Sequence, residues 1–511
     1  MKKLRALLFS RLLLVAVALI AQAVFFSALI VVFYNRLHIF YASSLLISAA
    51  VIIGIVSGNR NPAYKLAWVI PILLFPVFGG IFYIFIGHNR LTRRTRKRLT
   101  EILHRSFEAL PELADTIPPG IQTSFLDNLV THQSRYLAEY AQSPLCPHTR
   151  SLYLPDGETN FQYLLDELRK AQRYIFMEYF IITPGKMWDA ILEVLTEKAA
   201  SGVDVRLIYD DVGCLPSLSA GYPKKLKKLG IRCAVFNPVR PILHTSLNNR
   251  DHRKITVIDG TTAFTGGINL ADEYINAISP FGHWKDAGIM LTGDAAWSFT
   301  VLFLGMWDFL AGEDKPWSWY RFSQESGPGD GLVQPFADTP LDNESVGENV
   351  YLNMILKASD YLYITTPYLV IDNEMLTALT LAAKCGLDVR IMTPGRCDKW
   401  YVHAVTRSWY KTLLESGIRI FEYSPGFIHS KTFVADDRYG VVGTINMDFR
   451  SLYLHFECGV CLYHSSAVLE IRRDFLETAQ RCTEITLESI KTLPLSARLL
   501  GRFLRIFAPL M

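Results

Sequence analysis

Hydrophobic positions follow three patterns along the chain, and each pattern predicts a different kind of element. Long apolar runs cover residues 12–33, 37–57 and 63–87 near the amino terminus. From about residue 146 onward, short β-branched or aromatic runs alternate with segments of helical periodicity. The last stretch, residues 494–511, spaces arginines among leucines and phenylalanines as an amphipathic helix does. These patterns predict an apolar amino-terminal region, an α/β body and an amphipathic carboxyl-terminal helix.

The apolar runs predict an α-helical membrane anchor over residues 1–88, with two or three transmembrane helices. Each run is long enough, because about 20 helical residues cross the hydrocarbon core of a bilayer. Basic residues precede the first run and follow the third, and the positive-inside rule asks both groups to lie in the cytoplasm. Three full spans would place the two basic groups on opposite sides of the membrane. Either the amino end therefore lies outside, or one of the apolar runs does not fully cross. We expect a multi-pass protein of the cell membrane, with the catalytic part on the cytoplasmic side.

Two further segments each have two interpretations. Residues 89–145 are predicted to be a basic helical linker, and its first part, residues 90–110, suits either anionic lipid headgroups or water. The amphipathic helix at the carboxyl terminus suits either a membrane surface or packing on the body. The sequence leaves both choices open.

The body is predicted to be an internal duplication. Residues 202–208 read Gly-Val-Asp-Val-Arg-Leu-Ile, and residues 386–392 read Gly-Leu-Asp-Val-Arg-Ile-Met. Strands alternate with helices in both copies, which is typical of a central sheet covered by helices. We therefore expect two α/β sandwich units, packed as one body with pseudo-two-fold symmetry. The expected units are residues 146–325 and residues 326–511, the latter including the amphipathic helix.

Each copy carries the same set of reactive and phosphate-binding side chains. The pattern H-x-K-x4-D, then G-x-x-N, gives His252, Lys254, Asp259 and Asn269 in the first copy and His429, Lys431, Asp436 and Asn446 in the second. A neutral imidazole can attack phosphorus, and a protonated one can give a proton to the leaving oxygen. The lysines and asparagines can hold the phosphate oxygens. Such a site needs no metal, and no cluster of metal ligands is evident in the sequence. The pattern predicts phosphoryl transfer at one site built from both copies.

The doubled motif resembles the phospholipase D superfamily. The resemblance implies a covalent phosphohistidine intermediate, with one histidine as nucleophile and the other as general acid. We assign His252 as the nucleophile and His429 as the acid, although the internal symmetry allows the reverse. It also implies that an acidic residue beyond each asparagine orients a catalytic histidine, and Asp286 and Glu457 occupy these places.

Asp259 and Asp436 complete the catalytic motif in the two copies. Each follows an apolar, β-branched or aromatic run and begins a turn. Their position favours support of the strand-ending turn over attack on a substrate.

Two stretches resemble one family within that superfamily, the bacterial cardiolipin synthases. They are residues 266–274, Gly-Gly-Ile-Asn-Leu-Ala-Asp-Glu-Tyr, and residues 61–80, which are similar to that family's membrane hairpin. The resemblance implies an enzyme that converts two phosphatidylglycerol molecules into cardiolipin and glycerol without a cofactor. Membrane phospholipids are then the partners, and a homo-oligomer is left open. The alternatives are a phospholipase D acting on water or another alcohol or lipid acceptor, a membrane-bound nuclease, and an inactive membrane scaffold.

Composition narrows these alternatives. Hydrophobic residues make up 50% of the chain and charged residues 20%, which favours a membrane protein. The net charge of +4 is too small to predict nucleic acid as a partner, which argues against the nuclease. A scaffold would require decayed motifs, yet the His, Lys and Asp positions are intact in both copies. The cysteines are scattered, and Cys458-x-x-Cys461 would point to opposite faces of a strand, so we expect buried thiols rather than a metal or redox site.

Overall fold

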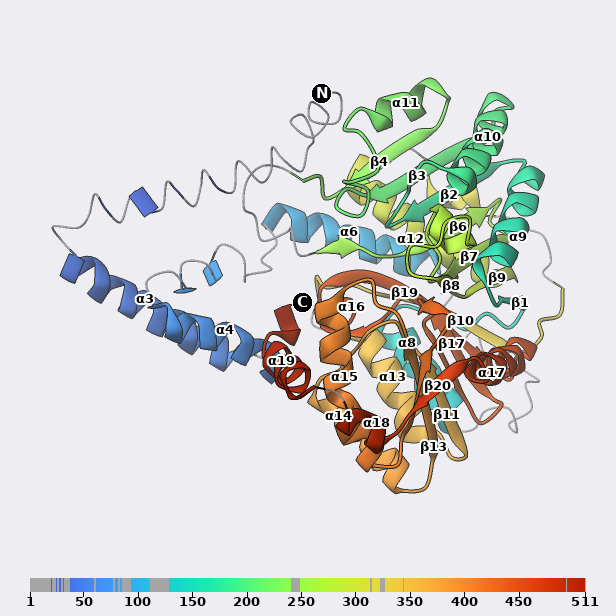
Figure 1. The fold of residues 1–511 in the computed structure, drawn as a ribbon. Helices are drawn as coiled ribbons and strands as arrows, with labels where there is room; N and C mark the ends of the chain where they lie inside the picture. Colours follow the sequence, from blue (N-terminus) through green and yellow to red (C-terminus); the bar gives the residue numbers. More distant parts are fainter. Residues whose placement is uncertain are drawn as a thin grey trace, which may run out of the picture.

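The computed structural model shows two α/β units, from which a pair of apolar helices extends (Figure 1). The pair consists of α3 (Leu37–Ser57) and α4 (Pro62–Leu74). The described residues are 20, 24, 27–28, 31, 37–58, 61–76, 79–80, 83–84, 93–110, 128–239, 249–312, 315–321, 327–342, 344–492 and 494–510.

The first unit is built around a seven-stranded mixed sheet with the order β1-β9-β7-β6-β2-β3-β4. The strands are β1 (Thr149–Leu154), β2 (Tyr174–Tyr179), β3 (Asp204–Asp210), β4 (Arg232–Phe236), β6 (Lys254–Ile258), β7 (Thr262–Gly266) and β9 (Gly288–Gly293). The pairs among β2, β3 and β4 are parallel, and the pairs from β1 across to β2 are antiparallel. The helices of this unit are α9 (Gly157–Lys170), α10 (Lys186–Ala200), α11 (Tyr222–Lys228) and α12 (Asp294–Ala311).

The second unit repeats this sheet in the order β10-β19-β17-β16-β11-β13-β14 and adds β20 (Cys482–Ile485) at the end. The strands are β10 (Leu332–Asp338), β11 (Tyr361–Thr365), β13 (Asp388–Pro394), β14 (Arg419–Tyr423), β16 (Thr432–Ala435), β17 (Tyr439–Gly443) and β19 (His455–Tyr463). The helices include α13 (Val346–Lys357), α14 (Asn373–Lys384), α15 (Trp400–Glu415), α16 (Phe449–Tyr453), α17 (Ser466–Ala479) and α18 (Leu487–Lys491). Because the strands follow in the same order, the predicted α/β duplication is confirmed.

A shared hydrophobic core joins the two units. One cluster of buried side chains contains Phe176 and Val257 from the first sheet together with Tyr363 and Val434 from the second. The helix α12 contributes to it and has most of its side chains buried. Burial of apolar area is the main favourable contribution to folding, so a continuous core favours one body over two separable domains.

Two short strand pairs cross from one unit to the other. In the first, β5 (Arg250–Asp251) pairs in parallel with β19 of the second unit. In the other, β15 (Gly426–Ile428) of the second unit pairs in parallel with β8 (His283–Lys285) of the first. His252 directly follows β5, and His429 directly follows β15. Each motif histidine is therefore positioned by a strand whose partner belongs to the opposite unit.

The linker predicted over residues 89–145 divides between the two units. Its basic helix α6 (Arg93–Ala109) packs against α12, where Arg105 Nη1 lies 2.9 Å from Asp308 Oδ2. A second helix, α8 (Asn128–Tyr140), packs against α13, and Asn353 Nδ2 donates to Gln133 Oε1 at 2.7 Å. The described residues of this segment include these two helices. The new finding is that these helices contact the body, one on each unit.

The apolar amino-terminal region contacts the second unit through the start of α4. Asn61 caps α4, and its Nδ2 donates to Asp372 Oδ2 at 2.8 Å and to the Tyr453 hydroxyl at 3.0 Å. Within the described part of the chain, no helix has both the length and the apolar character needed to cross a membrane. Most of the first apolar run and the end of the third lie outside the described residues.

The carboxyl-terminal helix α19 (Leu495–Arg505) packs on α15 through one face only. A Cβ at Gly501 would lie 2.7 Å from the Ala404 carbonyl oxygen, so the two helices approach closely there. The Arg505 guanidinium lies 3.6 Å from the centre of the Trp409 ring. The opposite face exposes Leu495, Leu499, Leu500 and Phe503. This helix therefore packs on the body and also presents an apolar surface.

Asp259 and Asp436 lie at the far ends of β6 and β16 from the histidines. Both residues adopt positive φ angles, of 53° and 54°. Their carboxylates accept hydrogen bonds of 2.7–3.0 Å from main-chain N–H groups, those of Gln172, Arg173 and Tyr174 for Asp259 and those of Ser359, Asp360 and Tyr361 for Asp436. These contacts agree with the expected structural support and correct the grouping of both residues with the catalytic ones, because their side chains hold the starts of β2 and β11.

Replacing Asp259 with alanine is expected to lower stability, because three main-chain N–H groups lose their acceptor. We expect the free energy of unfolding to fall by about 1–3 kcal/mol, since water partly replaces the carboxylate at this half-buried site. Thermal unfolding followed by circular dichroism measures the change. Asp166→Ala, which removes an exposed ion pair with Arg169, is the control and should change stability by less than about 0.5 kcal/mol. Equal effects of the two variants would contradict this role.

Candidate active site

The two motif histidines lie in one buried site between the units. His252 is 7% exposed and His429 is 6% exposed. The two halves are close enough to interact, since the charge of Lys254 acts on both His429 and Lys431. The predicted meeting of the two copies at one site is therefore seen in the structure.

Each histidine is hydrogen-bonded to a carboxylate of the opposite unit. His252 Nδ1 lies 2.9 Å and 3.0 Å from the two carboxylate oxygens of Glu457. His429 Nδ1 lies 2.7 Å from Asp286 Oδ2. An ionised carboxylate only accepts hydrogen bonds, so we assign the hydrogen of each ring to Nδ1, which leaves a lone pair on Nε2. Each of the two acids predicted to orient a histidine contacts one. The sequence analysis did not predict that each acid would contact the histidine of the opposite unit.

Main-chain hydrogen bonds fix each histidine beside its acid. The N–H of His252 donates to the carbonyl of Phe456 at 2.9 Å, directly before Glu457. The N–H of His429 donates to the carbonyl of Lys285 at 2.7 Å, directly before Asp286. These bonds extend the crossed strand pairs β5–β19 and β15–β8 by one residue. The imidazoles are held by the backbone as well as by their side-chain contacts.

The two acids are supported differently. Thr444 Oγ1 donates to Glu457 Oε2 at 2.5 Å. The matching residue in the first copy is Gly267, where a Cβ would lie 2.0 Å from Asp286 Oδ1. That oxygen instead accepts the N–H of Ala287 at 2.8 Å. The Thr444 hydroxyl therefore holds Glu457 by a hydrogen bond, and the absence of a side chain at Gly267 leaves space for Asp286.

The motif lysines are buried beside the histidines. Lys254 Nζ donates to the carbonyl of His252, and Lys431 Nζ donates to the carbonyl of His429. Burial lowers the pKa of Lys254 to about 8 and that of Lys431 to about 7. Burial disfavours the charged form because the ammonium loses its hydration. A phosphate anion would restore the favourable surroundings of that charge.

Burial also controls the protonation of the histidines and their acids. Burial lowers the pKa of His252 to about 3, and burial with the nearby Lys431 lowers that of His429 to about 4. Burial alone would raise the pKa of Glu457 and of Asp286, but the hydrogen-bonded histidines hold both below their usual values. The resting site therefore has neutral imidazoles and ionised carboxylates. A bound phosphodiester would add a negative charge and favour protonation of one imidazole.

The two motif asparagines occupy different environments. Asn269 Oδ1 accepts the N–H of Ile181 at 3.0 Å, and its Nδ2 donates to the Tyr274 hydroxyl at 2.7 Å. The Tyr274 ring lies 5.7 Å from the His429 ring, so Asn269 positions a neighbour of that histidine. Asn446 Oδ1 is buried and has no hydrogen-bond partner among the described residues. The equal roles predicted for the two asparagines are not reflected in their contacts.

A third histidine, which the sequence analysis did not identify, flanks the site. The ring of His455 lies 5.5 Å from that of His252, and in the other half the ring of Trp284 lies 5.4 Å from that of His429. Each flanking residue comes two positions before the acid of its own unit. Alternation along the strand could have identified His455, because residues two apart on a strand share a face.

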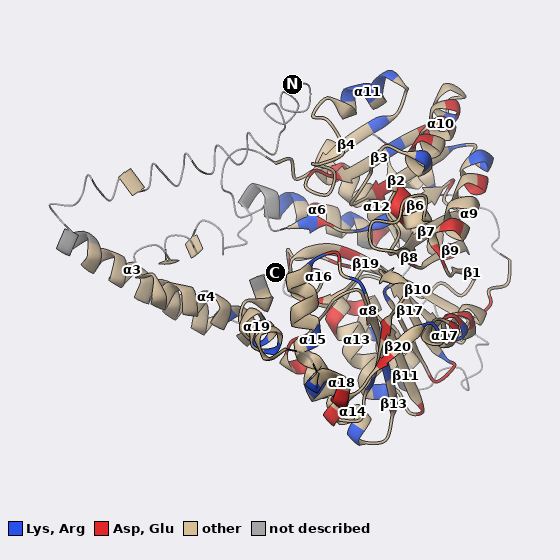
Figure 2. Ribbon diagram, viewed as in Figure 1, with Lys and Arg blue, Asp and Glu red and all other residues tan. Residues whose placement is uncertain are grey.

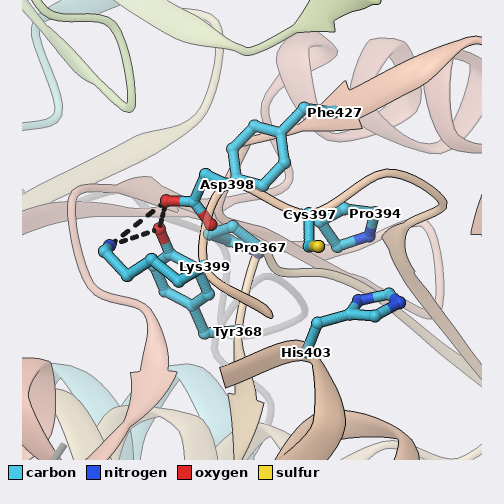
Figure 3. A pocket seen from close by; sticks show the side chains of 8 residues that line it. All are labelled: Pro367, Tyr368, Pro394, Cys397, Asp398, Lys399, His403 and Phe427. Carbon is cyan, nitrogen blue, oxygen red and sulfur yellow. Dashed lines mark hydrogen bonds and ion pairs between the residues drawn. The ribbon is translucent and has the colours of Figure 1, made fainter. Parts of the chain in front are cut away.

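A shallow pocket adjoins the His429 half of the site. Its lining residues are Pro367, Tyr368, Pro394, Cys397, Asp398, Lys399, His403 and Phe427 (Figure 3). The ring of Phe427 stacks on that of His429, with centres 5.8 Å apart. The Tyr368 hydroxyl donates to Asp398 at 2.5 Å and accepts from Lys399 at 2.9 Å. The pocket thus has a cation and a carboxylate in its lining and shares Phe427 with the surroundings of His429.

Comparison with known proteins matches both copies of the motif to one family model. A family model described as "Cardiolipin synthase, PLD-like domain" matches residues 164–278 and 351–479, which include both motifs. A second model, "Phospholipase_D-nuclease N-terminal", matches residues 45–88.

Relatives align over most of the chain. An uncharacterized protein of Streptococcus mutans is 40% identical, over 89% of this chain and 98% of its own length. Cardiolipin synthases of Geobacillus sp. and Halalkalibacterium halodurans are 37% and 34% identical, each over 92% of this chain and over 93% and 94% of their own lengths. The crystal structure of phosphatidylserine synthase from Haemophilus influenzae superposes with a TM-score of 0.56 at 16% identity, over 75% of this chain and 98% of that one, which shows a shared fold. The chain belongs to the cardiolipin synthase family of phospholipase-D-like proteins.

Proposed function

We propose that the chain is a membrane-bound cardiolipin synthase that transfers a phosphatidyl group from one phosphatidylglycerol to another and releases glycerol. The observation that supports this most directly is the reciprocal pairing of His252 with Glu457 and of His429 with Asp286. Two oriented imidazoles can supply a nucleophile and a proton donor at one phosphorus atom. The relatives named cardiolipin synthase support the choice of substrates.

In the first half of the reaction, His252 Nε2 attacks the phosphorus of the first phosphatidylglycerol. A nitrogen–phosphorus bond forms, and the bond from phosphorus to the glycerol oxygen breaks. His429, protonated when the anionic lipid binds, gives its proton to that oxygen, and glycerol leaves. The two motif lysines and Asn446 contact the phosphate oxygens in this scheme.

In the second half, the free hydroxyl of a second phosphatidylglycerol attacks the phosphorus. His429 accepts the hydroxyl proton, the nitrogen–phosphorus bond breaks, and His252 regains its lone pair. One phosphodiester is exchanged for another, so the reaction needs no nucleotide. Both histidines are less than a tenth exposed, which limits access of water as a competing acceptor.

The asymmetry of the two halves supports His429 as the acid. Its hydrogen bond to Asp286 is 2.7 Å, shorter than the 2.9 Å contact between His252 and Glu457. Each carboxylate accepts one further donor, the Thr444 hydroxyl for Glu457 and the N–H of Ala287 for Asp286, so the difference lies in the contact with the histidine. The histidine that holds a proton better is suited to donate it, and the other to attack.

Exposed apolar side chains support attachment to the bilayer through α3, α4 and α19. Figure 2 shows few charged residues along α3 and α4. The large apolar residues more than half exposed on these helices and at their ends are Leu46, Ile53, Val56, Leu66, Leu73, Leu74, Phe75, Leu495, Leu499 and Phe503. Large exposed apolar patches mark membrane or protein contacts, so these side chains support such a contact. Attachment keeps both lipid substrates concentrated near the site, and the basic residues at 90–98 favour the cytoplasmic face.

Product identification tests the proposed reaction. Purified full-length protein is incubated in mixed micelles with phosphatidylglycerol as the only phospholipid, and the products are measured by mass spectrometry. We expect equal amounts of cardiolipin and glycerol, because every transfer to a second lipid releases one headgroup. His252→Ala should reduce the rate at least about 10³-fold.

The control for this experiment is His132→Ala, a change at an exposed histidine of α8, which should keep the wild-type rate. Phosphatidic acid as the sole lipid product would contradict the proposal and indicate a hydrolase. Product formation only after addition of phosphatidylethanolamine would contradict the assigned acceptor.

Asp286→Asn tests the role of His429 through the pH dependence of kcat. The negative charge of Asp286 raises the pKa of His429 against burial, so its removal lowers that pKa. In this variant His429 loses its proton at a lower pH than in the wild type. Only the protonated form can donate to glycerol. We expect the high-pH limb of kcat to move to lower pH and the maximal rate to fall by about 10–10²-fold.

Asp166→Asn removes a carboxylate on the surface of α9 and is the matched control, with an unchanged profile. A shift of the high-pH limb toward higher pH, or an unchanged profile for Asp286→Asn, would contradict the assignment of His429 as the acid.

A further inference from the structure

The His252 half of the site contains a set of side chains typical of a metal centre. His252, His455 and Glu457 each offer one donor atom, and these atoms all lie within 4.8 Å of one another. All three residues are buried. Two imidazoles and one carboxylate form a common ligand set for Zn²⁺. We propose that Zn²⁺, or a divalent transition ion of similar preference, binds this triad and inhibits the enzyme.

The surroundings of His455 support a ligand at this place. His455 is 9% exposed, and neither ring nitrogen has a hydrogen-bond partner among the described residues. Its Nδ1 lies 3.7 Å from Glu457 Oε1, beyond hydrogen-bonding distance. Buried polar groups normally have partners, so this imidazole has an unused lone pair near an acid. A metal ion between the two would use both.

The spacing of the donor atoms suits a small tetrahedral ion. Ligands at about 2.0–2.1 Å from Zn²⁺ lie about 3.4 Å from one another in a tetrahedron. The observed separations from Glu457 Oε1 are 2.9 Å to His252 Nδ1 and 3.7 Å to His455 Nδ1, on either side of that value. Small rotations of the three side chains are enough to close the site around the ion. A fourth position remains for water.

Metal binding at this triad would remove the nucleophile. An ion held between His252 and Glu457 takes the Nδ1 lone pair, so the neutral ring must carry its hydrogen on Nε2. Nε2 then has no lone pair for attack on phosphorus. An ion bound through Nε2 would block that atom directly. Either geometry inhibits, and this consequence, unlike the binding itself, rests on the proposed function.

The other half of the site provides an internal contrast. Trp284 occupies the position that matches His455, and an indole ring is no metal ligand. His429 and Asp286 therefore lack the third donor that the His252 half has. This contrast predicts one ion per chain at the active site and an inhibition that depends on His455.

Binding is measured first, without substrate. Metal-free full-length protein is dialysed against Zn²⁺ at increasing concentration, and bound zinc is counted by atomic emission. We expect one tightly bound ion in the wild type. His455→Asn should weaken that binding by at least about 10–100-fold, and the exposed-histidine control His132→Asn should leave it unchanged. Replacement by Co²⁺ gives the same comparison through its visible absorption.

Inhibition by Zn²⁺ is measured second. The rate of each variant is compared with the rate of the same variant in the presence of a chelator. Zn²⁺ should inhibit the wild type and His132→Asn at equal concentrations and His455→Asn only at about 10–100-fold higher ones. Circular dichroism checks folding, and His455→Gln serves if the asparagine variant does not fold. Equal zinc binding by wild type and both His455 variants would overturn the proposal. A chain that binds zinc through His455 but makes no cardiolipin would refute the proposed function and leave the metal site standing.

Discussion

A buried hydrogen bond between a histidine of one unit and a carboxylate of the other is the interaction on which the rest of the structure depends. It occurs twice, as His252 with Glu457 and as His429 with Asp286. A charged carboxylate in the interior costs several kcal/mol unless it is paired, so each acid needs the opposite unit to be in place. The crossed strand pairs β5–β19 and β15–β8 supply that placement through the backbone. Folding of the two units together and assembly of the site are therefore one event.

The two units of the body are pseudo-symmetric, but the surroundings of their motif histidines differ. In one half, the short acid Asp286 fits against Gly267 and serves a histidine with aromatic neighbours. In the other half, the longer Glu457 is braced by Thr444 and has His455 on its own strand. The first arrangement favours a histidine that keeps a proton. The second gives a histidine with a longer contact to its acid and with His455, the proposed metal ligand, beside it. A duplicated fold can thus assign two different steps to two copies of one motif.

Much of the fold and of the candidate site could be predicted from the sequence, and the failures have physical causes. Hydrophobic periodicity and the repeated motif predicted both sheets and the catalytic pairs, because they depend on local spacing. The spacing of residues indicates which face of a strand a side chain occupies, but not which strand lies beside it. The contact of Glu457 with His252 of the opposite unit could therefore not be predicted from the sequence. Asp259 was grouped with the catalytic residues by its motif, but its place after the strand already favoured support of the turn, and its carboxylate binds main-chain N–H groups there. Asn269 and Asn446 match in sequence and differ in contacts, since the first bonds Ile181 and Tyr274 while Oδ1 of the second has no partner among the described residues.

The central claim is that His252 is the nucleophile and His429 the proton donor. The most direct test is to quench the enzyme in base during turnover of phosphatidylglycerol, digest it, and locate the phosphatidyl adduct by mass spectrometry. Alkaline quenching is needed because a phosphohistidine bond is labile in acid. We predict an adduct on the peptide that contains His252 and none on the peptide that contains His429. An adduct on His429, or turnover without any adduct, would contradict the account.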